Sequence, residues 1–292
     1  MAATVNVNGQ LFDAERAVVS VFDHGFLYGE GVYETLRTYN GRPFLFERHM
    51  RRLRSSASML SLTVPLDDAQ IAERFRQTTE AAGLDTLGAS TPAYIRILVT
   101  RGVGDLTYDP AACPTPSVVV IVKALVDAPA SVYENGVTVA LVDVVRNHPG
   151  SVNPLIKSNN LLNNALAMQE AVRRGAFEGV MRNYRGELAE CTTANLFVVK
   201  DGAALTPPIN AGLLPGITRE FVFEVGEELR LPVREQVLKD ADLLGADEAF
   251  LTSTTREIVP IVRVDDRTIG SGRPGPITKA LTDGFRRRAA GM

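Results

Sequence analysis

The spacing of hydrophobic and polar residues predicts strands through most of the first half of the chain. Alternating runs with β-branched residues indicate strands, and Asn-Gly pairs at 8–9 and 40–41 predict hairpin turns between them. Apolar residues at three- and four-residue steps predict helices over 47–60 and 67–83, the second with an aspartate cap. The strands predicted here are residues 5–7, 11–12, 17–22, 32–39, 42–46, 94–100 and 117–123.

The second half mixes the two periods more evenly. Helices are predicted after Lys157 up to Gly175 and over 217–230, 240–244 and 276–290, with strands over 137–145, 179–184, 195–200, 233–237 and 249–252. This mixture predicts an α/β or α+β fold with two domains. We expect an N-terminal domain of residues 1–126, a linker at 127–136 and a C-terminal domain of residues 137–292 that carries Lys157.

Composition narrows the class of protein. The 292 residues, 45% hydrophobic and 22% charged, are ordinary for a globular protein of one large or two smaller domains. A net charge of -3 predicts no nucleic-acid partner, and the apolar runs are too short to predict a membrane span or a secretory signal. Two cysteines favour a reducing, cytoplasmic location, and three scattered histidines predict no metal site.

Lys157 is the first candidate for chemistry. It stands between an apolar pair and a polar triplet, just before a run with helical periodicity. The positive end of a helix dipole disfavours an ammonium, and burial adds to this effect. A lysine in such a place is a candidate nucleophile for a Schiff base with a carbonyl group. An ordinary surface lysine near a helix start shows the same pattern, so the case depends on the rest of the chain.

Four further features point to a cofactor that carries a phosphate and a carbonyl group. Glu190, inward-facing in an extended segment, could pair with a pyridinium nitrogen. The start of a helix at Ile217 and Thr218 offers free backbone N–H groups to an anion. Thr254 follows an apolar strand in a Ser-Thr-Thr run and offers a hydroxyl and an amide, and Arg52 is a candidate phosphate ligand. Each has an ordinary structural explanation when it is taken alone.

Taken together, the residues resemble the fold-type IV (class IV) pyridoxal-phosphate enzymes over almost the whole chain. The motifs that carry the resemblance, in order, are Asp23-His24-Gly25, Tyr28-Gly29-Glu30-Gly31-Val32-Tyr33-Glu34, His49-Met50-Arg51-Arg52-Leu53, Lys157-Ser158, Glu190, Asn195-Leu196-Phe197, Leu214-Pro215-Gly216-Ile217-Thr218-Arg219 and Ser253-Thr254-Thr255-Arg256. The family includes branched-chain aminotransferases, D-amino acid aminotransferases and aminodeoxychorismate lyases.

The resemblance implies a role for each matching residue. Lys157 would bind pyridoxal 5'-phosphate as a Schiff base and move the proton at the substrate α-carbon. Glu190 would pair with the pyridine nitrogen, while the phosphate would be bound by Arg52, Ile217, Thr218 and Thr254. The substrate pocket would be lined by Tyr28, Tyr33, Tyr94, Arg96, Thr254 and Thr255.

The choice of family member depends on fewer residues. The Ala93-Tyr94-Ile95-Arg96 segment and the loop at 101–106 look like branched-chain aminotransferases, in which this loop covers the partner's site in a homodimer. We therefore expect transfer of the amino group of leucine, isoleucine or valine to 2-oxoglutarate by a ping-pong route. The segment after Lys157 is closer to D-amino acid aminotransferases, which are the alternative. Thr35, where branched-chain enzymes commonly have glycine, keeps an aminodeoxychorismate lyase as the third possibility.

Overall fold

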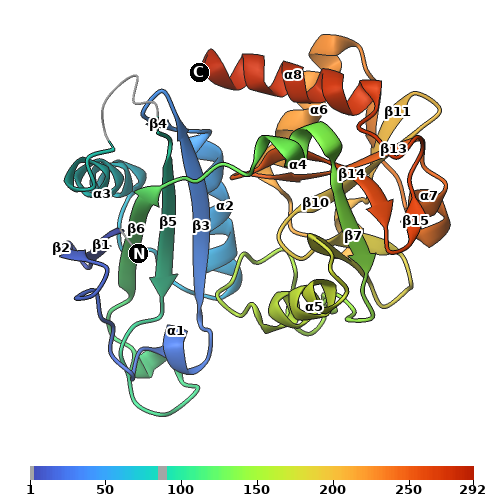
Figure 1. The fold of residues 1–292 in the computed structure, drawn as a ribbon. Coiled ribbons are helices and arrows are strands. Elements are labelled where there is room, and N and C mark those ends of the chain that lie inside the picture. The colour runs from blue at the N-terminus through green and yellow to red at the C-terminus, as the bar shows by residue number, and fades with distance from the viewer. Residues whose placement is uncertain (1–2, 85–90) are drawn as a thin grey trace. The chain divides into compact units, whose positions relative to one another are not determined.

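The computed structural model describes residues 3–84 and 91–292, and the described chain divides into two compact units (Figure 1). The first unit holds the chain up to Val126 together with residues 156–161. The second holds residues 127–155 and 162–291. The mixed α/β class predicted from the sequence is confirmed. The expected linker at 127–136 includes a short helix, α4 (Ala130–Asn135), and lies in the second unit.

The first unit is built on a sheet whose six described strands run in the order β2-β1-β6-β5-β3-β4. Every described pair in it is antiparallel. The strands are β1 (Thr4–Val7), β2 (Gln10–Asp13), β3 (Gly31–Tyr39), β4 (Arg42–Pro43), β5 (Ala93–Thr100) and β6 (Ser117–Ala124), and the helices are α1 (His24–Leu27), α2 (Phe46–Met59), α3 (Asp68–Ala81) and the 3-10 turn η1 (Pro110–Ala112).

Helices α2 and α3 cover one face of this sheet. Their apolar residues, among them Met50 and Phe75, form one core with the alternate residues of β3, β5 and β6. Along β5 every second residue from Ala93 is fully buried in this core, and the residues between them are half-buried on the other face. That other face carries Tyr94 and Arg96. The alternation along β5 therefore puts the apolar residues in the core and these two predicted substrate-binding residues on the opposite face.

Local sequence explains where α3 and the first hairpin form. Asp67 accepts a hydrogen bond from the amide of Gln70, whose side chain accepts one from the amide of Asp67, which is a complete capping box. The Asn8-Gly9 turn has positive φ at both residues, as a type I′ hairpin needs, and joins β1 to β2 as predicted. The predicted strand at 17–22 is wrong: this segment is a loop in which several apolar side chains are exposed.

Residues 156–161 complete the first unit. The two-residue strand β4 pairs only with the end of β3, at Thr38 and Tyr39. At the start of β3, the amide of Tyr33 donates to the carbonyl of Lys157 (3.0 Å), and the amide of Asn159 donates to the carbonyl of Gly31 (2.9 Å). The expectation that Lys157 belongs to the C-terminal domain is therefore corrected, since residues 156–161 group with the N-terminal unit and join the start of β3 through an isolated β-bridge between Val32 and Ser158.

The second unit contains a sheet of nine described strands in the order β12-β11-β10-β13-β14-β7-β8-β9, with β15 paired to β14. The strands are β7 (Val137–Leu141), β8 (Glu178–Arg182), β9 (Leu188–Cys191), β10 (Asn195–Lys200), β11 (Ala203–Thr206), β12 (Val233–Glu235), β13 (Glu248–Ser253), β14 (Glu257–Val264) and β15 (Arg267–Thr268). The helices are α4, α5 (Leu162–Arg173), α6 (Ile217–Leu229), α7 (Asp240–Leu244), α8 (Pro276–Ala290) and the 3-10 turn η2 (Ile209–Ala211).

The helix predicted after Lys157 is α5, which starts at Leu162, five residues after the lysine. Its buried residues are Ala167 and Ala171, whereas the larger apolar residues Leu162 and Leu166 are exposed. Helices α6 and α8 start where the sequence indicates, and among the described residues no helix is long and apolar enough to cross a membrane.

Candidate functional site

Lys157 is held by contacts with two elements of the first unit. Its carbonyl is bonded to β3, and its amide donates to the hydroxyl of Ser56 on α2 (3.1 Å). Its side-chain Nζ lies 4.4 Å from the ring centroid of Tyr33. The backbone of this lysine is therefore fixed by an edge strand and a helix, which orients its amine.

The Lys157 amine is available for chemistry. Among the described residues no carboxylate lies within ion-pair distance of it. The amine instead contacts the aromatic face of Tyr33. The guanidinium carbon of Arg96 lies 4.0 Å from the same ring centroid. Tyr33 pairs with Leu98 across the sheet, so Arg96 is its diagonal neighbour on this face. Three of the predicted site residues are thus brought together around one ring.

Gly31 makes this arrangement possible. A Cβ at this position would lie 2.6 Å from the amide nitrogen of Asn159 and 2.7 Å from the carbonyl oxygen of Val99. The segment after Lys157 can approach β3 only because residue 31 has no side chain. Gly31 therefore marks a close approach between β3 and the segment after Lys157.

A buried ionic cluster lies on the helix side of β3. Glu34 is fully buried and accepts two hydrogen bonds from Arg52 of α2 (2.7 and 2.8 Å) and one from Nδ1 of His49 (2.7 Å). Burial alone would raise the pKa of Glu34, but the neighbouring Arg52 guanidinium and then His49 hold it far below its usual value. Glu34 is therefore an anion at neutral pH.

His49 and Arg52 are not the solvated decoration that the helical pattern also allows. His49 is completely buried, and its Nε2 makes no hydrogen bond within the described chain. Burial lowers the pKa of His49, the charge of Glu34 opposes this, and the charges of Arg52 and Lys157 lower it further. The net direction is downward, so the imidazole is neutral at pH 7. The fork of Arg52 is oriented by Glu34, while its contact with a phosphate stays a prediction.

The other two predicted aromatic residues lie elsewhere in the first unit. Tyr94 is on the same sheet face as Arg96 and contacts the amine of Lys123, 5.2 Å from its ring centroid. Tyr28 follows α1 and packs against His24 and Tyr108, with ring centroids 4.9 and 5.0 Å away. Their contact with a substrate stays a prediction.

Glu190 is the centre of a buried group in the second unit. It lies on β9, and Oε1 accepts from Nε of Arg146 (2.7 Å). Its Oε2 accepts from the amide of Leu214 (3.1 Å) and more weakly from the side chain of Asn195 (3.4 Å). The inward orientation expected from the sequence agrees with its 5% exposure.

Arg146 was not identified from the sequence. Its guanidinium also donates to Oδ1 of Asn163 on α5 (3.2 Å), and Asn163 donates in turn to the carbonyl of Val145 (2.8 Å). The arginine is 92% buried. It keeps a cation beside Glu190 and thereby stabilises the ionised carboxylate. No local pattern distinguishes it from a surface arginine, since β8 and β9 bring the two residues together from 44 positions apart.

The start of α6 is organised by a second close approach. Gly216 is its N-cap, and a Cβ there would lie 1.8 Å from Oδ1 of Asn195. Asn195 also donates to the carbonyl of Leu214 (2.9 Å), which ties this loop to β10. The first-turn amides of Ile217 and Thr218 have no partner within an α-helix, so they are available to an anion. Both residues are buried.

The Ser-Thr-Thr run forms the turn between β13 and β14. Thr254 and Thr255 are half-buried, and helix α6 packs against β13. The next residue, Arg256, donates to Glu178 (2.8 Å) and to the hydroxyl of Thr193 (2.5 Å). The fully buried Glu178 also accepts from the hydroxyls of Thr192 and Thr193.

The predicted site residues thus fall into two groups, one in each unit. Those of the first unit are Tyr28, Tyr33, Arg52, Tyr94, Arg96 and Lys157, and those of the second are Glu190, Ile217, Thr218, Thr254 and Thr255. The roles of Glu34, Arg146 and Glu178 were missed. Glu34 and Arg146 are buried ions that contact the site residues Arg52 and Glu190, and Glu178 is a buried ion that holds Arg256 next to the β13–β14 turn; burial of an ion is not visible in a local pattern.

The donor set fits a phosphate-bearing aldehyde on an aromatic nitrogen ring. An uncommitted primary amine can form a Schiff base, and a buried carboxylate can keep a ring nitrogen protonated. Helix N-terminal amides, threonine hydroxyls and an oriented guanidinium are typical phosphate ligands. These groups are Lys157 in the first unit and Glu190 and the start of α6 in the second.

Comparison with known proteins agrees with this chemistry. The family model "Amino-transferase class IV" matches residues 31–264. A Methanocaldococcus jannaschii protein named "Putative branched-chain-amino-acid aminotransferase" is 38% identical over 97% of this chain and 95% of its own. A D-alanine aminotransferase from Staphylococcus haemolyticus is 33% identical over 97% of this chain and 96% of its own.

Solved structures agree as well. The branched-chain amino acid aminotransferase of Escherichia coli superposes with a TM-score of 0.93 at 32% identity, covering 100% of this chain and 96% of that one. The branched-chain aminotransferase of the archaeon Thermoproteus uzoniensis, solved with norvaline, gives a TM-score of 0.88 at 31% identity, covering 100% and 96%. The chain therefore belongs to the class IV aminotransferases, the pyridoxal-phosphate-dependent enzymes of fold type IV.

Proposed function

We propose that this aminotransferase moves the amino group of branched-chain L-amino acids to 2-oxoglutarate by a ping-pong mechanism. The observation that carries the proposal is the Tyr33 ring with the Lys157 amine and the Arg96 guanidinium both against it. An amine that could act as a base and a cation that could bind a carboxylate thus lie beside one partly apolar surface. The resemblance to branched-chain enzymes at the 93–96 segment and the M. jannaschii relative support the same substrate class.

The residues proposed to bind the cofactor would each have a separate role. Pyridoxal 5'-phosphate, when bound, supplies an aldehyde for the amine of Lys157 and an electron-withdrawing ring. Glu190 would hold the ring nitrogen protonated, with Arg146 fixing the charge of Glu190. The Arg52 guanidinium would hold the phosphate together with the groups Ile217, Thr218 and Thr254.

The substrate side depends on the first unit and on the β13–β14 turn. Lys157 Nζ would take the proton from the substrate α-carbon and return it later, as a general base and then a general acid. Arg96 or Thr255 would bind the substrate carboxylate. The rings of Tyr28, Tyr33 and Tyr94 would line the space for the branched side chain.

A D-amino acid aminotransferase is the second candidate. The observation that favours it is the 33% identity to the S. haemolyticus D-alanine aminotransferase over 97% of this chain. The segment from Lys157 through the start of α5, with its Gln169-Glu170-Ala171 sequence, also resembles D-amino acid aminotransferases. Both candidates use the same cofactor residues, so only the substrate distinguishes them.

Enantiomer pairs in the half-reaction distinguish the two candidates. L-leucine is expected to convert the bound cofactor to the pyridoxamine form, with release of 4-methyl-2-oxopentanoate. This conversion should be at least about 100-fold faster than with D-leucine or D-alanine, because a site that fixes both the carboxylate and the side chain accepts only one enantiomer. Rapid-mixing absorbance and oxo-acid release measure it. A second half-reaction with 2-oxoglutarate should then yield L-glutamate. Faster conversion by D-alanine than by L-leucine would assign the enzyme to the second candidate.

We also propose a homodimer, on the basis of an exposed apolar patch in the first unit. The loop at 17–22 and the loop after β5 lie side by side, since Gly104 donates to the carbonyl of Phe22 (3.2 Å) and His24 to that of Gly102 (2.9 Å). The exposed apolar residues on these two loops and on α1 between them are Val18, Val19, Val21, Phe22, Phe26, Val103, Leu106 and Tyr108. So many exposed apolar side chains on adjoining segments favour an interface.

The dimer is expected to persist at micromolar concentration. Sedimentation equilibrium should give about twice the 31.6 kDa chain mass, and Leu106→Glu, which places a charge in the patch, should shift the mass toward one chain. The exposed Val172→Glu on α5 is a matched control that should leave the mass unchanged. A wild-type mass of one chain would exclude the proposal.

A further inference from the structure

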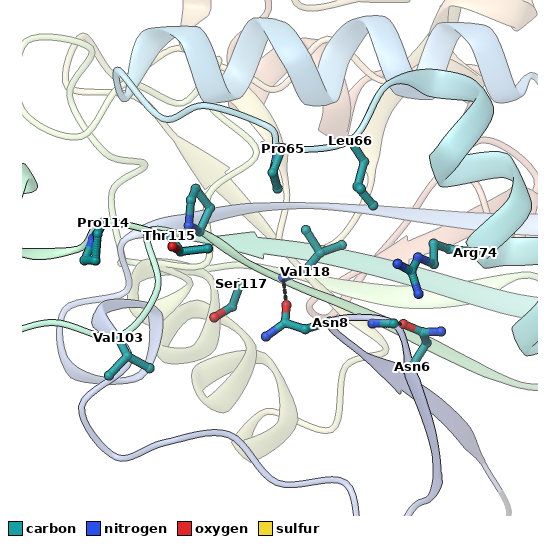
Figure 2. Close-up of a pocket in the computed structure, with 12 residues that line it drawn as sticks. Asn6, Asn8, Pro65, Leu66, Arg74, Val103, Pro114, Thr115, Ser117 and Val118 are labelled. Atoms are coloured by element: carbon teal, nitrogen blue, oxygen red, sulfur yellow. Dashed lines mark hydrogen bonds between the residues drawn. The ribbon is translucent and has the colours of Figure 1, made fainter.

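A separate pocket in the first unit lies between α3 and the first hairpin (Figure 2). Its volume is about 510 Å³, within the range of small-molecule sites. Its walls come from the β1–β2 turn, the connection from α2 to α3, the loop after β5 and the start of β6. None of the residues assigned above to cofactor or substrate lines it, and no acidic residue lines it.

The walls of the pocket are held by hydrogen bonds. Asn8 and Val118 bond to each other twice, through the amide of Asn8 (2.9 Å) and through its side-chain oxygen (2.8 Å), as Figure 2 shows for the second bond. The capping box at Asp67 fixes the start of α3, which carries Arg74. A site with fixed walls loses little entropy when a ligand binds.

Two hydrogen-bond donors meet at one end of this pocket without an acceptor. Asn6 is 98% buried, its Oδ1 accepts from the amide of Gly9 (2.9 Å), and its Nδ2 donates to no atom within the described residues. The guanidinium of Arg74 lies against Gly9, because a Cβ there would be 2.4 Å from Nη1. Figure 2 shows the two side chains next to each other. Two adjacent donors without a protein acceptor favour an anion between them.

Arg74 differs in this respect from its neighbour on the same helix. Arg76 pairs with Glu73 and Glu80, at 2.7 and 2.8 Å. Arg74 has no ion pair with any carboxylate in the described part of the chain, although it is half-buried. A half-buried guanidinium beside an unsatisfied amide is costly unless a ligand completes it.

The other residues that line the pocket favour a ligand whose uncharged part is apolar. Pro65, Leu66, Pro114, Pro116 and Val118 give the pocket an apolar lining. A substrate-like amino acid carries an ammonium group, which would be desolvated here without a carboxylate partner. The lining therefore favours a monoanion with an apolar body over a zwitterion.

We propose that this pocket binds a small carboxylate with a branched or linear apolar chain and no ammonium group, such as a 2-oxo acid. The carboxylate accepts two hydrogen bonds from Arg74 and one from Nδ2 of Asn6, and the chain packs against the prolines and Val118. The inference does not rest on the proposed function, since binding here requires no turnover. If the proposed function holds, the oxo-acid products of that reaction belong to the class of ligand that this pocket takes.

Equilibrium dialysis of the holoenzyme with radiolabelled 4-methylvalerate tests the proposal. This probe has the carboxylate and the branched chain but no amino or oxo group, so it is not turned over. Arg74→Gln is expected to remove one equivalent of binding per chain by weakening it at least about tenfold, because the bidentate pair is lost. Arg76→Gln, on the same helix but outside the pocket, should bind as the wild type does.

A second variant shows whether a loss of binding in Arg74→Gln comes from the missing guanidinium or from a change in folding. Asn6→Asp keeps the acceptor for the amide of Gly9 but supplies a carboxylate to Arg74 from within the chain, so it should also lose the Arg74-dependent equivalent. L-leucine should compete for that equivalent at least about tenfold less well than 4-methyl-2-oxopentanoate. Equal binding by wild type and Arg74→Gln, or equal competition by the two ligands, would overturn the proposal. Neither result depends on whether the enzyme transaminates leucine.

Discussion

Lys157→Ala is expected to lower kcat for amino transfer by at least about 10,000-fold while leaving the fold intact. The variant removes both the amine that binds the aldehyde and the base that moves the α-proton. Residues that act in two roles at one centre produce losses of this size. Rates with L-leucine and 2-oxoglutarate, and the visible absorbance of bound cofactor, measure the two losses separately. The fold should persist because the backbone bonds of residue 157 to Ser56 and β3 do not use its side chain.

The matched control is Lys123→Ala. Lys123 is also a lysine of the first unit over a tyrosine ring, with its Nζ 5.2 Å from the centroid of Tyr94. It has no assigned role in binding the aldehyde, so its loss should leave the cofactor absorbance unchanged and kcat within about threefold. Comparable rates for Lys157→Ala and the wild type would refute the assignment of the nucleophile. Partial recovery by added methylamine would support its role as a proton carrier.

Glu34→Gln is expected to lower the free energy of unfolding of the protein by about 3 kcal/mol or more at pH 7. The change removes the negative charge beside the buried guanidinium of Arg52 and replaces one of the two acceptor oxygens, which serve Arg52 and His49, with a donor. It should also weaken cofactor binding about tenfold or more, since the fork of Arg52 loses its fixed orientation. Chemical unfolding of the apo-protein measures the first effect, and equilibrium titration with pyridoxal phosphate measures the second. Glu73→Gln, in an exposed pair with Arg76, should change neither.

The stabilising effect of Glu34 should depend on pH in one direction. Its pKa is lower in the folded protein than the unfolded value of about 4.3, so the unfolded chain binds more protons in this range. The contribution is fully present above the unfolded pKa and is lost as pH falls through the folded value. The difference in stability between wild type and Glu34→Gln should therefore be constant from about pH 8 to about pH 6 and shrink below about pH 4. A difference that grows as the pH falls would contradict the assignment of an ionised carboxylate.

Elements with strong local signals could be predicted, and those that depend on distant segments could not. The capping box of α3 and the Asn8-Gly9 hairpin formed as expected, because their hydrogen bonds close within four residues. The loop at 17–22 has the composition of a strand, but it is paired with no strand among the described residues. Alternation predicts a half-buried surface, and an exposed interface gives the same signal.

The candidate site also contains residues that could be predicted from local motifs and residues that could not. Lys157 and Glu190 could be proposed because family motifs surround them; in the structure Lys157 lies beside Tyr33 and Glu190 is buried, and their roles stay predictions. Arg146 and Glu178 were missed, because each meets its partner through strand pairing in the second unit. Long-range pairing of ions depends on which strands become neighbours, and the sequence specifies that only through the whole fold.

The attachment of residues 156–161 to the first unit has a consequence for how the polypeptide matures during synthesis. The ribosome must complete the first strand of the second unit, β7, before it delivers the segment that the first unit lacks. Until then the start of β3 is an open edge, and Ser56 lacks the amide to which it bonds. A nascent chain that stops at residue 126 therefore contains a nearly finished sheet without Lys157, the proposed nucleophile, which arrives only with the segment that bonds to β3.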